Sequence, residues 1–213
     1  MGILLSGNIF KTGRGALLFP AMALIALLLT GCATTDESVN FLYQPTTFGR
    51  GGSGDLYLAR GNQPAAGKEK SSELTIGEIK NGSGEIKGHI ISVRSPEDIV
   101  TDAFSREFKA AGYNVIPVQG LPANVGKGIR LESVTVQLDE VKGLVKLETV
   151  CTVKVKLEPW RNGVAIKKLN YENTYTASTV AGRDLFLLQS LQSTMQELMA
   201  RVVREVTVVL EKQ

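Results

Sequence analysis

The sequence has very little histidine, cysteine and tryptophan. Its 213 residues include one histidine, two cysteines and one tryptophan. The lone histidine, His89, excludes metal sites that need a histidine pair, and any serine–histidine hydrolase would depend on it. No G-x-S-x-G elbow accompanies it, and its apolar neighbours favour a structural or surface position. We therefore predict a protein that is not an enzyme, with no catalytic residue and no metal or other cofactor.

An excess of charge of one sign is also missing. The chain has 24 basic and 21 acidic residues, and its first 31 residues contain Lys11 and Arg14 but no acid. Without that segment, 22 basic residues face 21 acidic ones, and the chain is close to neutral. A nearly neutral protein sets up no long-range field that would attract nucleic acid, so we expect no nucleic-acid partner.

No apolar run is long enough to cross a membrane. The longest, 16–29, is well short of the roughly 20 residues that a spanning helix needs, and Pro20 interrupts it. Lys11 and Arg14 stand in front of it. A basic region, a short apolar region and small residues behind them are typical of a secretory signal peptide, and an uncleaved signal anchor is the alternative.

Leu29-Thr30-Gly31-Cys32 closes this run and resembles the bacterial lipobox. The resemblance implies cleavage between Gly31 and Cys32, a diacylglycerol group on the Cys32 thiol, and a further acyl chain such as palmitate on the new N-terminus. Two or more chains hold a protein stably at a membrane. Ala33 stands where an Asp retains enterobacterial lipoproteins in the inner membrane, so we expect the periplasmic face of the cell outer membrane, with the inner membrane as the alternative.

Cys151 is left without an intramolecular partner if lipid occupies Cys32, so we expect no disulfide framework. Its neighbours Val150 and Val153 predict that it is a small buried residue of a strand.

Three segments follow from these patterns: a signal peptide over 1–31, a lipidated N-terminus and glycine-rich tether over 32–55, and one domain over 56–213. Residues 49–54 match G-x-G-x-x-G, but no strand leads into them and no helix follows, so we interpret them as linker. Clustered aromatic residues at 41–43 predict that part of the tether docks on the domain.

Along the domain, the spacing of apolar residues is typical of strands in some segments and of helices in others. Helices are predicted after the Ser95-Pro96 cap, ending at Gly112, and over 184–212. Strands are predicted at 56–58, 74–80, 85–93, 113–118, 129–140, 147–157 and 164–175, the last with a bulge at Lys167-Lys168. We expect an α+β fold, a two-layer sandwich in which two helices pack on one face of an antiparallel sheet.

The only tryptophan, Trp160, precedes Arg161 at a predicted hairpin tip. Tips are surface sites, and Trp and Arg are frequent in binding hot spots, so the pair is a candidate for partner contact. The alternative is that Trp160 folds back onto the sheet edge. The lysines and glutamates of the hairpins are expected to pair across strands on a solvated face.

The element order behind a lipobox resembles the YajG-type family of bacterial envelope lipoproteins, through the segment 95–118, the long hairpins and the terminal helix. The resemblance implies a lipid-anchored, non-enzymatic accessory or binding protein with a partner in the cell envelope. A similar element order in auxiliary lipoproteins of ABC-type lipid transporters leaves such a subunit as the alternative.

Overall fold

The computed structural model describes residues 36–46, 51–60, 74–180 and 183–212. The predicted signal peptide, 1–31, lies outside the described residues. In chain order the elements are β1 (Glu37–Val39), β2 (Asp55–Arg60), β3 (Thr75–Asn81), β4 (Ile86–Ser92), α2 (Pro96–Ala110), β5 (Asn114–Val118), β6 (Lys127–Lys142), β7 (Leu147–Arg161), β8 (Val164–Ala165), β9 (Leu169–Thr179) and α3 (Arg183–Glu211).

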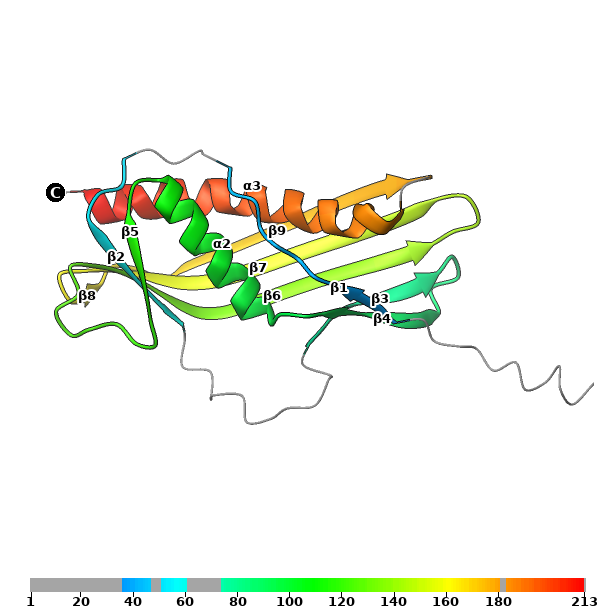
Figure 1. Cartoon of the computed structure of the whole chain (residues 1–213), viewed down its shortest axis with the longest axis horizontal. Helices are drawn as coiled ribbons and strands as arrows, with labels where there is room; N and C mark the ends of the chain where they lie inside the picture. The colour runs from blue at the N-terminus through cyan, green and yellow to red at the C-terminus, as the bar shows by residue number, and fades with distance from the viewer. Residues whose placement is uncertain (1–35, 47–50, 61–73, 181–182, 213) are drawn as a thin grey trace, which may run out of the picture. The chain divides into compact units, whose positions relative to one another are not determined.

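The long strand β6 organises the sheet (Figure 1). One edge of β6 pairs antiparallel with β7 along its whole length, and β9 continues the sheet beyond β7. The other edge is shared: β2 pairs with the first part of β6 and β3 with its last residues. Farther from β6, β5 pairs with β2 on one side, while on the other β4 pairs with β3 and β1 pairs with β4.

The prediction of an antiparallel sheet is wrong, because the sheet is mixed. Four strand pairs are parallel: β1 with β4, β2 with β5, β2 with β6, and β3 with β6. Parallel partners cannot be joined by a hairpin and need long connections, and here the chain passes through at least two other elements between each pair of partners. The hairpin signals in the sequence report only the antiparallel neighbours.

Both helices contact each other and the sheet, which confirms the α+β class. α3 contacts β7 and β9, whereas α2 packs on β6, β5 and β2 (Figure 1). Phe104 and Phe108 of α2 are fully buried in a core that they share with Leu191 and Val202 of α3. The start of α2 is as predicted, since Ser95 Oγ accepts a hydrogen bond of 3.1 Å from the Asp98 amide.

Part of the expected tether belongs to the domain. β1 is a strand of the sheet, and the Val93 amide donates to the Val39 carbonyl at 3.1 Å. Phe41 and Tyr43, which follow β1, are buried in the core. The aromatic cluster therefore docks on the domain, as its composition indicated.

The last predicted strand, 164–175, is interrupted instead of bulged. β8 ends at Ala165 and β9 begins at Leu169, with residues 166–168 between them. The Ile166 amide donates to the Pro159 carbonyl at 2.9 Å, which turns the chain at the point where the apolar positions of the sequence change from even to odd numbers. The sequence shows this shift of the apolar residues from even to odd positions, but a break between two strands accounts for it as well as a bulge within one strand does.

Candidate binding surfaces

The two cysteines have different environments. Cys32 and Gly31 lie outside the described residues. Cys151 lies in the middle of β7 with no exposed surface, as predicted, and burial raises the pKa of its thiol to about 11. The Cys151 thiol is therefore protonated at neutral pH and shielded from reagents.

The predicted hairpin tip joins β7 to β8. Its two turn residues, Asn162 and Gly163, have positive φ angles of 52° and 74°, as a tight hairpin turn requires. The turn lies against the loop before β6: the Gly163 amide donates to the Val125 carbonyl at 2.8 Å, and the Asn162 amide donates to the Gly126 carbonyl at 2.9 Å. These bonds fix the direction of the hairpin.

Trp160 is half-buried beneath an arginine. The guanidinium carbon of Arg130 lies 5.0 Å from the centre of the indole ring, and the Arg130 side chain also pairs with Glu158. Burial is the largest single influence and raises the pKa of Glu158, but the hydrogen bonds from Arg130 and its other neighbours, together with the Arg130 charge, outweigh it and hold this pKa below its usual value. Within the described residues the indole Nε1 has no hydrogen-bond partner.

Arg161 is engaged at the end of α3. Its Nη1 donates to the carbonyl oxygen of Lys212 and lies 3.5 Å from that of Val209. The last carbonyls of a helix lack partners within the helix, so a cation there satisfies them and complements the helix dipole. The structure gives Arg161 a structural contact, and its role in partner contact stays a prediction.

Apolar side chains of the β7–β8 hairpin lie on both faces of the sheet near Trp160. Ala165 of β8 is its partner in the register, and the flanking Val164 and Ile166 are 65% and 39% exposed. We call Trp160, Val164, Ile166 and Arg130 the hairpin-end surface. Trp160 stands out in the sequence as the only tryptophan, whereas Arg130 was not predicted, because it lies 30 residues away in the chain and has no local signal.

A second exposed apolar group lies in the turn between β6 and β7. Leu144 and Val145 are 106% and 80% exposed, and Val180, just beyond β9, is 77% exposed. These three residues, which we call the apolar turn surface, line a shallow pocket together with Lys142 and Lys146. This surface was not predicted, although two adjacent large apolar residues between lysines in a turn are unusual enough to mark it.

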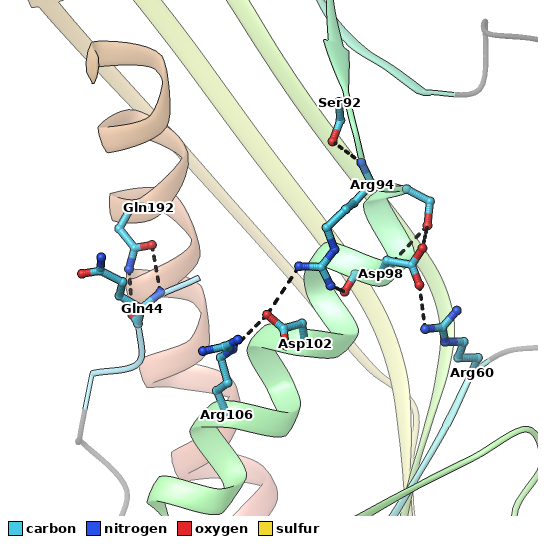
Figure 2. Close-up of polar contacts among 9 residues, drawn as sticks. Gln44, Arg60, Ser92, Arg94, Asp98, Asp102, Arg106 and Gln192 are labelled. Atoms are coloured by element: carbon cyan, nitrogen blue, oxygen red, sulfur yellow. Dashed lines mark hydrogen bonds and ion pairs between the residues drawn. The ribbon is translucent and has the colours of Figure 1, made fainter. Parts of the chain in front are cut away.

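The segment after β1 is held to both helices. The buried carboxylate of Glu107 in α2 accepts hydrogen bonds from the Tyr43 hydroxyl at 2.5 Å, the Thr46 amide at 2.7 Å and the Thr46 hydroxyl at 3.1 Å. On α3, the Gln192 side chain accepts from the Gln44 amide at 3.2 Å and donates to the Gln44 carbonyl at 2.7 Å (Figure 2). We call the segment after β1, residues 40–46, the leader, and these bonds the leader clip.

Charged side chains of α2 pair with one another and with two arginines outside the helix. Asp102 receives Arg106 at 2.9 Å and Arg94 at 3.6 Å, while Asp98 pairs with Arg60 of β2 at 2.6 Å (Figure 2). On the sheet, Lys154 pairs across strands with Glu172 at 3.0 Å, as predicted for a solvated face.

The described residues hold neither a candidate metal site nor a membrane-spanning helix. They contain no group of three or more His, Cys, Asp or Glu side chains that could hold a metal ion. His89 is exposed on β4. None of the described helices combines the length and the hydrophobicity that a membrane-spanning helix needs.

Comparisons with known proteins gave similarity of structure alone: no family model and no curated protein matches the sequence. A DUF330-family protein from Xanthomonas campestris matches with 9% identity and a TM-score of 0.49, over 82% of this chain and 95% of that one. A minor lipoprotein from Acinetobacter baumannii matches with 11% identity and a TM-score of 0.38, over 73% and 93%. Rare lipoprotein B from Shewanella oneidensis matches with 9% identity and a TM-score of 0.30, over 63% and 92%.

Proposed function

We propose that the protein is a lipid-anchored lipoprotein of the bacterial cell envelope that binds another envelope component and catalyses no reaction. The observation that carries the anchor is Leu29-Thr30-Gly31-Cys32 behind a short basic and apolar segment. The other cysteine, Cys151, is buried in β7, which leaves Cys32 as the candidate for modification. Ala33 favours the periplasmic face of the outer membrane.

Labelling with radioactive palmitate tests the anchor, with the second cysteine as a matched control. Cys32→Ser should abolish incorporation of the label and release the protein from the membrane fraction. Cys151→Ala should keep both, since the buried thiol takes no part in anchoring. Label that persists in Cys32→Ser, or that is lost in Cys151→Ala alone, would contradict the proposal.

The hairpin-end surface is the proposed contact for an envelope partner. Trp160 and Arg130 supply an aromatic ring and a cation, which are groups enriched in binding hot spots, and exposed Val164 and Ile166 of the same hairpin region supply apolar area. Arg161 lies beside this surface and is included in the proposal, although its guanidinium also holds the end of α3.

Cross-linking in intact cells tests this surface. Val164→Ser should reduce a specific cross-link to the partner while changing stability by less than about 0.5 kcal/mol, because the side chain is mostly exposed. Leu185→Ser near the start of α3 is the control, since Leu185 is 63% exposed and lies at the opposite end of that helix from Val209, which Arg161 contacts. Equal cross-linking by both variants and the wild type would remove the hairpin-end surface from the proposal.

The transporter alternative predicts a different partner. An auxiliary subunit of an ABC-type lipid transporter should co-purify with an ATPase and a permease after mild detergent extraction. The accessory lipoprotein proposed above should not.

A further inference from the structure

Three hydrophobic side chains project from one end of the sheet. Leu144 and Val145 form the turn between β6 and β7, and Val180 follows β9. Leu147 pairs with Thr179, so Val180 lies next to the turn. These large apolar side chains are exposed to water, and moving them into an apolar medium would lower the free energy.

The lysines beside this turn add no excess of positive charge. Lys142 pairs with Glu140 at 3.1 Å, and Lys146 pairs with Glu148 at 3.0 Å. The long apolar stems of lysines can lie along a bilayer interface while their ammonium groups stay among polar headgroups. Attraction at this end should therefore come from hydrophobic contact and not require anionic lipid.

The direction of β1 shows from which end the chain enters the domain. β1 is parallel to β4, with Glu37 opposite Ile90, and the Asp36 carboxylate accepts a hydrogen bond of 2.9 Å from the His89 amide. Since β4 runs away from the β3–β4 turn, the chain enters β1 from the side of that turn.

The β3–β4 turn and the apolar turn lie at the same end of the sheet (Figure 1). Asn81 is the register partner of Lys142. A Cβ placed on Gly82 would lie 3.8 Å from the Cα of Gly143. The chain therefore enters the domain from the end that carries Leu144 and Val145.

The length of chain between Cys32 and β1 limits how far a lipid on Cys32 can be from this end. Glu37 is five positions after Cys32, just as Ile90 is five positions after Glu85 in the β3–β4 turn. Five residues span at most about 18 Å. A bilayer that holds the acyl chains of Cys32 would then lie near the apolar turn.

We propose that the apolar turn surface inserts into the interface of the bilayer that holds the lipid anchor, so that Leu144, Val145 and Val180 form a second membrane contact. This inference rests on the proposed lipidation of Cys32. The hairpin-end surface, at the other end of β7, then points away from that bilayer and toward a partner.

Quenching of tryptophan emission by brominated lipid tests this contact. The mature lipoprotein is purified in detergent and reconstituted into phosphatidylcholine vesicles with ordinary or brominated acyl chains. The wild type reports on Trp160, its only tryptophan, at the far end of β7. Leu144→Trp adds an indole at the apolar turn, and Val164→Trp adds one at the opposite end as the matched control.

We expect brominated lipid to remove about half of the emission of Leu144→Trp, because one of its two indoles lies at the headgroup–acyl boundary. The wild type and Val164→Trp should be almost unaffected. Leu144→Trp emission that brominated lipid leaves unchanged, as it would be if the turn docks on a protein, overturns the inference. Equal quenching of Leu144→Trp and Val164→Trp overturns it as well.

The intact mass of the same sample separates this inference from the proposed function. A mass without acyl chains would remove the lipid anchor and the inference with it. An acylated mass with unquenched Leu144→Trp would remove the inference alone.

Discussion

At the residue scale, Glu107 is the buried charge on which the docking of the leader depends. Its carboxylate has almost no exposed surface and accepts three hydrogen bonds from Tyr43 and Thr46. A buried carboxylate is tolerated when such donors replace the water it has lost. Burial, with the neighbouring carboxylate of Glu107, raises the pKa of Tyr43, so its hydroxyl keeps its proton and remains a donor.

Tyr43→Phe should lower the free energy of unfolding by about 1–3 kcal/mol, because the buried carboxylate loses a donor. Denaturant titration measures the loss, and faster proteolysis within residues 36–46 should accompany it. Tyr57→Phe in β2 is the control, since the Tyr57 hydroxyl has no partner among the described residues. A loss as large in Tyr57→Phe as in Tyr43→Phe would contradict the role of the leader clip.

Cys151 should not react with thiol reagents in the folded protein. It has no exposed surface and a pKa of about 11, whereas in the unfolded chain it titrates near the ordinary value of about 8.5. We expect a colorimetric disulfide reagent at pH 8 to detect no thiol in the folded mature protein and one after denaturation. Rapid labelling of the folded protein would show that β7 opens locally.

The position of Trp160 could be predicted from the sequence, but its surroundings could not. Asn162-Gly163 marks a tight turn, and this local signal places Trp160 near the end of a strand. The Arg130 guanidinium over the ring and the contact of Arg161 with α3 join residues that are far apart in the chain. Such contacts depend on how β6, β7 and α3 pack.

At the scale of elements, the turn between β7 and β8 requires glycine. Gly163 has a φ of +74°, and a Cβ there would lie 2.5 Å from the carbonyl oxygen of Ala123. Gly163→Ala should lower the free energy of unfolding by at least about 1–2 kcal/mol, the cost of a left-handed conformation. Gly120→Ala is the control, because its Cβ would meet nothing within 4 Å. Thermal or denaturant unfolding of the two variants measures the difference, and equal stability would contradict this reading of the turn.

Glu205 couples α3 to the segment between β8 and β9 and to β9 itself. Its carboxylate lies 2.6 Å from Lys167 Nζ and accepts a hydrogen bond of 2.7 Å from the Tyr171 hydroxyl. The bond from Lys167, followed by that from Tyr171, lowers the pKa of Glu205 below its usual value. This contribution to stability is therefore complete above the unfolded pKa and is lost as pH falls through the lower folded one.

The melting temperature of the wild type should exceed that of Glu205→Gln at pH 7, and the difference should shrink as pH falls below about 4.3, the ordinary pKa of glutamate. Melting curves of the two proteins from pH 7 to pH 3 measure it. A difference that is constant over this range would show that the charge of Glu205 is irrelevant.

Most elements could be predicted from the sequence, but their arrangement only in part. Alternation over 147–157 and the helical period over 184–212 are local patterns, and both elements lie where those patterns end to within a few residues. β1 was missed because three residues are too few to show alternation. The parallel pairs of β6 were missed because their partners, β2 and β3, are set by packing and not by neighbouring turns.

At the scale of the whole molecule, the residue after Cys32 is expected to decide which membrane holds the protein. Ala33→Asp should move a lipidated protein from the outer to the inner membrane in an enterobacterial host, where an Asp at this position retains lipoproteins. Density-gradient separation of the two membranes measures the shift. Ala33→Ser is the control and should stay with the outer membrane, and an unmoved Ala33→Asp would contradict the proposed sorting.

The short strand β1 also decides how the domain would bear a mechanical load. A pull on a lipidated Cys32 enters the domain at Asp36 and runs along β1, away from Val39. The hydrogen bonds between β1 and β4 lie across that direction, so they are strained together and not one after another. The leader clip stands behind them as a second point of resistance. The protein is thus connected so that drag on the domain is shared among several bonds before any part of the core has to open.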